Sequence, residues 1–281
     1  MTLPQPGDAF EWTDTPGRAA LVCRPLEPVA RHIFTSRLWP LTPAGGADAA
    51  ESWNGIAHAL GAADRSRLLR ARQVHGASVL THREGEAIGQ PTDADILITS
   101  DPQVAVAIQT ADCVPVLIAD TGTGAVAAAH AGWRGMAQRV PLATVEAMVN
   151  AFGTRPSQLV AAIGPSIGAC CYEVGGEVRD QFAGAGFNER EMARWFSRES
   201  RPSPTNPSIA GLGPHARDGH WVLDLWTAAA DQLRAAGVRD DRIFVAQLCT
   251  ASHPDALCSY RREGSAAGRM AAAISARRTM L

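Results

Sequence analysis

The chain has 281 residues, of which 46% are hydrophobic and 19% charged, and its formal net charge is -2. This composition provides a sizeable core and excludes general disorder, and the small net charge, without a dense basic run, argues against nucleic acid as a partner. We therefore expect a soluble globular protein with one compact domain over residues 1–281.

Short apolar runs in the first half of the chain are typical of strands. Three of them are separated by Pro- and Gly-rich segments: residues 19–23, 31–35 and 77–81. A helix is expected over residues 50–62. Four more strands follow at close spacing: residues 95–100, 104–109, 114–120 and 125–130. The sequence TGTG between the last two is a typical turn and predicts a hairpin.

Helices and strands alternate only partly in the second half. The helices are expected over residues 141–153, after residue 177, over 223–238 and from near residue 264, and the strands over 159–164 and 243–250. Residues 197–220 are rich in Pro, Ser and Gly and predict a long surface loop. We expect an α+β fold, with mixed β-sheets flanked by helices.

The chain has six cysteines and no lysine. No cysteines form a Cys-x-x-Cys pair, which excludes a zinc ribbon, and without an export signal we expect reduced thiols. All 26 basic residues are arginine, which excludes Schiff-base and P-loop lysine chemistry. The longest apolar runs fall far short of the roughly 20 residues that span a bilayer. We therefore expect a cytoplasmic protein with no membrane partner.

A thiol and two histidines stand next to predicted strands. Cys113 is at the entrance of the strand over 114–120, His130 ends the next strand, and His75 follows an earlier one. Two imidazoles and a thiolate suit Zn²⁺, and three protein ligands leave a fourth position open for water or substrate. Each residue taken alone is equally consistent with a structural role, as a buried thiol or a hydrogen-bonded histidine.

Several longer motifs decide between these interpretations. The segments RQVHG, DADILIT, TADCVPVLIAD, AAAHAGWRG, AAIGPSIGACCYEVG and SYRREGSAAGRMAA run in order from about residue 70 to residue 275. Together they closely resemble the YfiH family, also called the laccase-domain or multicopper polyphenol oxidase family. The resemblance implies a single zinc ion held by His75, Cys113 and His130, with copper as the alternative metal.

The resemblance is weaker near the N-terminus. The segment FTSRLWPL keeps only the arginine and leucine of the matching family segment, and the glycine pair of that segment is gone. Arg37 is therefore expected at the active site, and the loop that closes the site is expected to differ in this chain.

The resemblance also implies an enzyme, a purine nucleoside phosphorylase acting on adenosine, inosine, guanosine and methylthioadenosine, with adenosine deaminase side activity. Its partners would be purine nucleosides and phosphate, in a monomer or a homodimer. Phosphorolysis needs a cationic cradle for phosphate, and a planar guanidinium can hold phosphate through two hydrogen bonds. Arg134, four residues after His130, is the expected catalytic arginine, and Arg37 and Arg261 are expected to bind substrate.

Two carboxylates are candidates for moving protons. Asp112 precedes Cys113, and in a strand its side chain would point away from that of Cys113, which favours an orienting role. Glu173, in the CCYEVGGE segment, is its rival and is equally consistent with a helix start. Gln73 and Tyr172 lie inside the matched motifs and are expected to bind substrate.

Other functions remain open at this point. Two His and one Cys are also the trigonal ligand set of a blue-copper site, which would suit a laccase-like polyphenol oxidase. The chain has eight histidines and no His-x-His pair, however, so the usual trinuclear copper cluster cannot be built. Cys113 with a histidine base would instead suit a thiol hydrolase. The resemblance to the family implies that such a hydrolase would edit peptidoglycan precursors. A binding protein with a structural zinc is the third alternative.

Overall fold

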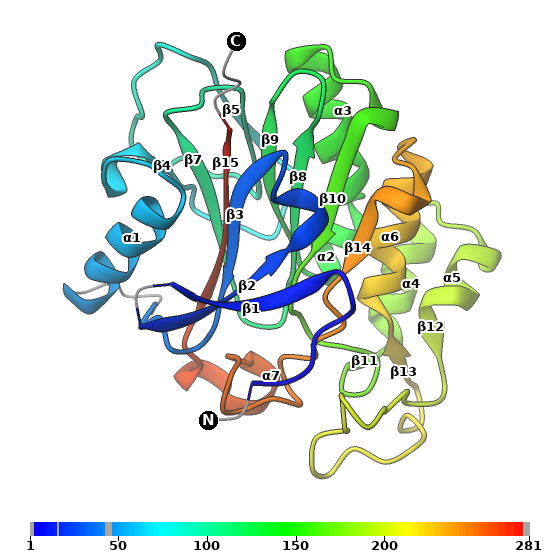
Figure 1. The fold of residues 1–281 in the computed structure, drawn as a ribbon. Coiled ribbons are helices and arrows are strands. Elements are labelled where there is room, and N and C mark those ends of the chain that lie inside the picture. Colours follow the sequence, from blue (N-terminus) through cyan, green and yellow to red (C-terminus); the bar gives the residue numbers. More distant parts are fainter. Residues whose placement is uncertain (1–2, 16, 43–46, 278–281) are drawn as a thin grey trace.

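The computed structural model describes residues 3–15, 17–42 and 47–277. Within these residues the chain forms two six-stranded sheets, a three-stranded sheet and seven α-helices. Figure 1 shows the two large sheets side by side, with α1 on one flank and the α2, α3 and α6 region on the other.

The first large sheet, sheet 1, brings the N-terminal strands together with the last strand of the chain. Its order is β1 (Phe10–Thr15), β2 (Arg18–Cys23), β3 (Ala30–Thr35), β15 (Met270–Ala276), β7 (Ala105–Thr110) and β4 (Leu68–Leu69). All neighbours are antiparallel except β4 and β7.

The second large sheet, sheet 2, contains the central hairpin. Its order is β14 (Ile243–Val245), β10 (Leu159–Ile163), β8 (Val114–Asp120), β9 (Val126–Ala131), β6 (Ile96–Thr99) and β5 (Val79–His82). The two outer pairs, β14 with β10 and β5 with β6, are parallel, and the inner pairs are antiparallel.

The remaining elements cover these sheets. The small sheet is β11 (Glu173–Gly175), β13 (His220–Leu223) and β12 (Phe196–Ser197). The helices are α1 (Ala47–Ala59), α2 (Trp133–Ala137), α3 (Val140–Phe152), α4 (Gly176–Gly184), α5 (Glu189–Trp195), α6 (Leu225–Ala235) and α7 (Tyr260–Glu263).

Strand β8 is buried on both faces, which explains its unbroken apolar sequence. Because side chains alternate along a strand, Val116 and Ile118 pack on one side with residues of α3 and α6, while Leu117 and Ala119 pack on the other against sheet 1. The outer face of sheet 1 is covered by α1. The layers are therefore helix, sheet, sheet and helices, and the predicted α+β class with mixed sheets is confirmed.

Two predicted elements differ from the structure. The helix expected from near residue 264 is wrong, because residues 270–276 form β15, between β3 and β7. Alanine favours helices, but here small side chains are needed between a second sheet and α1, and packing overrides propensity. The strand expected over 243–250 ends at Val245, and Gln247 adopts a left-handed φ of 52° shortly after.

Residues 197–220 are exposed over most of their length but are attached to the rest of the fold at several points, one of which is buried. Asn206 is buried, donates to the Gln247 carbonyl at 2.8 Å and accepts from the Cys249 N–H at 2.7 Å. The Asn206 side chain thus gives hydrogen-bond partners to two backbone groups, the Gln247 carbonyl and the Cys249 N–H, in a segment where no neighbouring strand supplies them. Among the described residues, no helix combines the length and the apolar character needed to cross a lipid bilayer.

A buried histidine in sheet 1 gives the fold a pH dependence. His32 accepts the Cys23 N–H at Nε2, 2.8 Å away, and burial lowers its pKa to about 4. The unfolded chain therefore binds more protons than the folded one below the ordinary histidine pKa, and stability falls as pH drops from about 6.5 to about 4. We expect the titration of His32 to lower the free energy of unfolding by about 2 kcal/mol between pH 7 and pH 5.

The check is urea unfolding at both pH values for the wild type and His32→Gln, whose amide oxygen accepts the same N–H without titrating. The stability loss between pH 7 and pH 5 should be smaller in the variant by that amount. Equal losses in the two proteins would contradict a neutral buried His32.

Candidate metal centre and adjoining pocket

Three side chains converge at one edge of sheet 2. The donor atoms of His75, Cys113 and His130 all lie within 4.8 Å of one another. The two imidazole rings stand nearly perpendicular, at 76°, with centroids 4.9 Å apart. An ion at about 2.0–2.3 Å from nitrogen and sulfur ligands fits between donors at such spacing. The structure thus brings together the three residues predicted as ligands.

Strand direction explains this convergence. Cys113 precedes β8 and His130 lies near the end of the antiparallel β9, in register with Pro115, so both belong to the same edge. His75 precedes β5, which enters the sheet from that edge. His75 and Asp112 both have a left-handed φ, 61° and 86°, a conformation that non-glycine residues adopt at a cost.

Asp95, at the entrance of β6, organises the centre. Its Oδ1 accepts from His130 Nδ1 at 2.7 Å and from the His75 N–H at 3.1 Å, and its Oδ2 accepts from the N–H groups of Val74 and Gly76. His130 Nδ1 is thereby assigned as a donor, which leaves Nε2 for the centre. Burial raises the pKa of Asp95, but these hydrogen bonds outweigh it and lower the pKa.

Asp95 is a site residue that was not predicted from the sequence, although a signal was present. The residue stands in the DADILIT motif, at a strand entrance, as Asp112 does in TADCVPV. An acid that opens an otherwise apolar strand needs a buried partner, and the histidines were available.

Gly132 leaves room for the ligands. A Cβ at this position would lie 2.8 Å from Cys113 Sγ and 3.1 Å from His75 Cδ2. The backbone after β9 therefore passes directly beside the donor atoms, and only a residue without a side chain fits there.

The charges of Cys113 and His130 support each other. Burial raises the pKa of the Cys113 thiol, but the His130 charge and hydrogen bonds from both histidines outweigh this and lower it to about 6. Burial lowers the pKa of His130, yet the Cys113 charge and the bond to Asp95 raise it to about 9. The thiolate is the form of Cys113 that binds metal, whereas His130 has to release its Nε2 proton when an ion binds.

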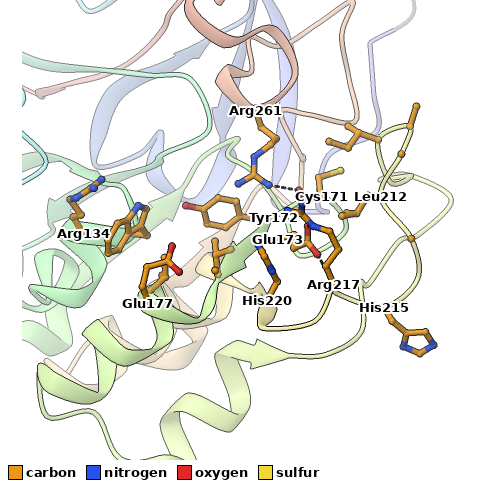
Figure 2. Close-up of a pocket in the computed structure, with 18 residues that line it drawn as sticks. Arg134, Cys171, Tyr172, Glu173, Glu177, Leu212, His215, Arg217, His220 and Arg261 are labelled. Carbon is orange, nitrogen blue, oxygen red and sulfur yellow. Dashed lines mark hydrogen bonds and ion pairs between the residues drawn. The ribbon is translucent and has the colours of Figure 1, made fainter.

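A cavity of about 690 Å³ lies next to the segment that follows His130, because Trp133 and Arg134 line it, although the three predicted ligands are not part of its lining. Four of the predicted site residues line it: Arg134, Tyr172, Glu173 and Arg261. Figure 2 shows Tyr172 between Arg134 and Arg261. Burial and the charge of Cys113 both raise the pKa of the Tyr172 hydroxyl, which places this ring close to the metal centre.

Arg134 and Arg261 line the cavity with guanidinium groups that are not paired with a carboxylate of any described residue. Arg134 lies over the Trp133 ring at 4.2 Å, and Arg261 lies 5.1 Å from the Tyr172 ring and donates to the Cys171 carbonyl at 3.4 Å. Within the described part of the chain, neither guanidinium forms an ion pair with a carboxylate. An anion entering the cavity would therefore meet two available cations.

Both candidate carboxylates are held by other protein groups. Asp112 accepts from Thr250 Oγ1 at 2.5 Å and from the Arg261 N–H at 2.6 Å, and burial raises its pKa. Its side chain thus holds the start of α7. Glu173 accepts from the N–H and Nε of Arg217, at 2.6 and 2.8 Å. Burial raises the Glu173 pKa, but these bonds prevail and lower it.

Two further predicted residues lie outside the cavity lining. Gln73 is paired with the backbone of Gln109, donating to its carbonyl and accepting from its N–H, each at 2.7 Å. Arg37 donates to the Pro254 carbonyl and forms an ion pair with Glu263 at 3.3 Å. Other lining residues were not predicted. Most come from the segment expected to be a surface loop, and one comes from the first turn of α4: Ile209, Leu212, His215, Arg217 and His220 in the segment, and Glu177 in α4.

Comparison with known proteins agrees with this architecture. The profile of the family described as multi-copper polyphenol oxidoreductase laccase matches residues 46–277, which is most of the chain. The chain belongs to this family. The resemblance seen in the sequence motifs is confirmed.

Curated relatives of this laccase-like chain carry enzyme names. It is 39% identical to a purine nucleoside phosphorylase of Bacteroides thetaiotaomicron over 64% of its own length, a match spanning 60% of that relative. It is 38% identical to one of Deinococcus radiodurans, over 80% of its length and 76% of the relative. It is also 34% identical to adenosine deaminase RL5, from an unknown prokaryotic organism, over 73% of its length and 74% of that protein.

The fold of this laccase-like chain is also found in a solved structure. The hypothetical protein YfiH of Bacillus licheniformis superposes with a TM-score of 0.79, covering 96% of this chain and 100% of the other, at 23% sequence identity. At this identity the likeness establishes the fold. The predicted α+β class is therefore also that of a known relative.

The space at Gly132 yields a prediction. In Gly132→Ala the new methyl group would press on Cys113 Sγ and His75, so we expect zinc affinity to fall at least tenfold while the fold is retained. Isothermal titration with Zn²⁺ and circular dichroism check this. Gly184→Ala is the control, because a Cβ there meets nothing within 4 Å. Unchanged affinity in Gly132→Ala would contradict a centre at this position.

Asp95→Asn is expected to weaken the centre by a different route. The new amide NH₂ group would face at least one of the N–H groups that now donate to the carboxylate, and two donors cannot form a hydrogen bond. His130 and the 74–76 segment would therefore lose an acceptor that both now use. Zinc affinity should fall 10- to 100-fold. Competition against a chromophoric chelator measures it, and wild-type affinity in the variant would show that Asp95 does not orient the ligands.

Proposed function

We propose that this laccase-like chain is a zinc-dependent purine nucleoside phosphorylase that acts on adenosine, inosine, guanosine and methylthioadenosine and deaminates adenosine as a side activity. The observation that carries the proposal is the cavity in which Arg134 and Arg261 flank Tyr172 beside the His75–Cys113–His130 centre. The names of the relatives support the same reaction class.

The donor set fits zinc. Two imidazoles and one thiolate, with Gly132 leaving space beside them, suit a borderline-soft ion that keeps one position open. When bound, zinc would supply a Lewis acid at the edge of the cavity. Copper also accepts these ligands, but the described residues contain no second group of histidines that could hold further copper ions. This favours zinc and a nucleoside enzyme over a laccase-like oxidase.

The arginines would hold phosphate. Arg134 and Arg261 reach the cavity from different elements, α2 and α7, and each guanidinium can donate two parallel hydrogen bonds to phosphate oxygens. Phosphate fixed in this way can attack the ribose carbon that carries the base. Two cations also stabilise negative charge that develops as the base leaves.

Tyr172 would serve the base. Its ring offers an apolar face for a purine, and its hydroxyl, protonated at neutral pH like that of any tyrosine, can donate a hydrogen bond to the leaving nitrogen. Asp112 and Glu173 would act as positioning residues, since Asp112 accepts from the Arg261 N–H and Glu173 holds Arg217 at the cavity wall.

The proposal is tested with adenosine and phosphate, with adenine, inosine and hypoxanthine resolved chromatographically. We expect adenine release that requires phosphate and that Cys113→Ala abolishes. The control is Cys23→Ala, which removes a buried thiol in sheet 1. Zinc-loaded protein with no nucleoside turnover would contradict the proposal and favour the peptidoglycan-editing hydrolase instead.

The arginines should affect phosphate more than nucleoside. Loss of a hydrogen-bonded charge contact costs about 1.5–3 kcal/mol, so Arg134→Gln and Arg261→Gln should each lower kcat/KM for phosphate about 10- to 100-fold. Steady-state kinetics with either substrate varied will show the difference. Arg239→Gln is the control, because this exposed arginine pairs with Asp241 and lies outside the cavity. Equal effects on both substrates would argue against a phosphate cradle.

A further inference from the structure

A second cluster of soft ligands lies at the same edge of sheet 2. The sulfur atoms of Cys170, Cys171 and Cys249 all lie within 4.8 Å of one another, and each residue is at most 2% exposed. Cys170 and Cys171 follow β10, and Cys249 follows the parallel β14, so the two chain segments leave the sheet together. A bridge between Ser166 and Cys249 keeps them side by side.

A fourth donor completes the cluster. Ser252 Oγ lies 3.5 Å from both Cys170 Sγ and Cys171 Sγ and donates its own hydrogen to the Pro207 carbonyl at 2.6 Å. Its lone pairs are therefore free to face the sulfurs. A tetrahedral zinc ion, with Zn–S of about 2.3 Å and Zn–O of about 2.0 Å, holds sulfur and oxygen ligands roughly 3.5 Å apart. The observed separation matches this geometry.

The surroundings suit thiolates that bind an ion. The Gly168 N–H donates to Cys249 Sγ at 3.3 Å, a contact that stabilises negative charge on sulfur. Otherwise the cluster is enclosed by apolar side chains such as Ile167 and Ala251, where three thiolates without a cation would be unfavourable.

Two cavities come close to the cluster. Cys171 is among the residues that line the 690 Å³ cavity, and Cys170 is among those that line a second cavity of about 500 Å³.

We propose that Cys170, Cys171, Cys249 and Ser252 bind a second, structural Zn²⁺ ion. Four protein donors close the coordination sphere, so this ion holds the fold and takes no substrate. It would brace the cavity wall on both sides, because Cys171 precedes Tyr172 and Cys249 precedes Thr250, which donates to Asp112. The site stands on its own contacts and does not depend on the proposed nucleoside chemistry.

The first test uses the full-length wild type, saturated with Zn²⁺ and gel-filtered under reducing conditions. Mass spectrometry of the metal content should find two zinc ions per chain. X-ray absorption at the zinc edge should find an average of two sulfur ligands per zinc, because one ion would have one sulfur ligand and the other would have three. One zinc per chain with a single sulfur would overturn the proposal. One zinc with three sulfurs would support it and contradict the His75–Cys113–His130 centre instead.

Variants separate the two sites. Cys249→Ala should retain one zinc with one sulfur, Cys113→Ala should retain one zinc with three sulfurs, and Cys23→Ala, a buried thiol far along the chain from both clusters, should keep two ions. Two ions retained in Cys249→Ala would overturn the proposal. The wild-type sulfur count decides the question even if Cys249→Ala fails to fold.

Discussion

The hydrogen bonds of the buried Asp95 carboxylate are the interaction on which the His75–Cys113–His130 cluster depends. An ionised acid away from water is costly unless its oxygens are fully hydrogen bonded, and here four N–H donors meet it. Three of these donors belong to the 74–76 segment and one to His130. One side chain therefore holds an exposed segment and a buried strand in a fixed relation, and His75 reaches the centre because of it.

A shared sheet edge extends this arrangement to the rest of the site. The strands of sheet 2 run so that the starts of β5, β6 and β8 and the ends of β9, β10 and β14 all lie at one edge. Both sulfur-containing clusters, Asp95 and Asp112 come from the residues next to those strand ends. Rigid strands thus bring ligands from distant parts of the chain together, while the loops beyond them form the cavity (Figure 2).

Asp112 links the two clusters. It stands between the start of β8 and the C-terminal segments, accepting from Thr250 and from the Arg261 N–H. Its left-handed φ turns its side chain toward these groups while Cys113 faces the histidines. The orienting role predicted for Asp112 stays a prediction. The contacts indicate that the part it would orient is the start of α7, which contains Arg261.

The sequence by itself determined the local features. Apolar runs and turn residues placed the strands from residue 95 to 131, the hairpin and the α+β class, and the motifs placed four residues on the cavity wall. Only the tertiary structure decided the rest: β15 in place of a helix, Gln73 and Arg37 outside the cavity lining, Asp95 among the histidines, and the three cysteines beside Ser252. The physical reason is that sheet order and register join segments far apart in the chain, as in the pairing of Ala276 with Ala30, which are 246 residues apart. Propensity and spacing along the chain contain no information on which strand edges will meet.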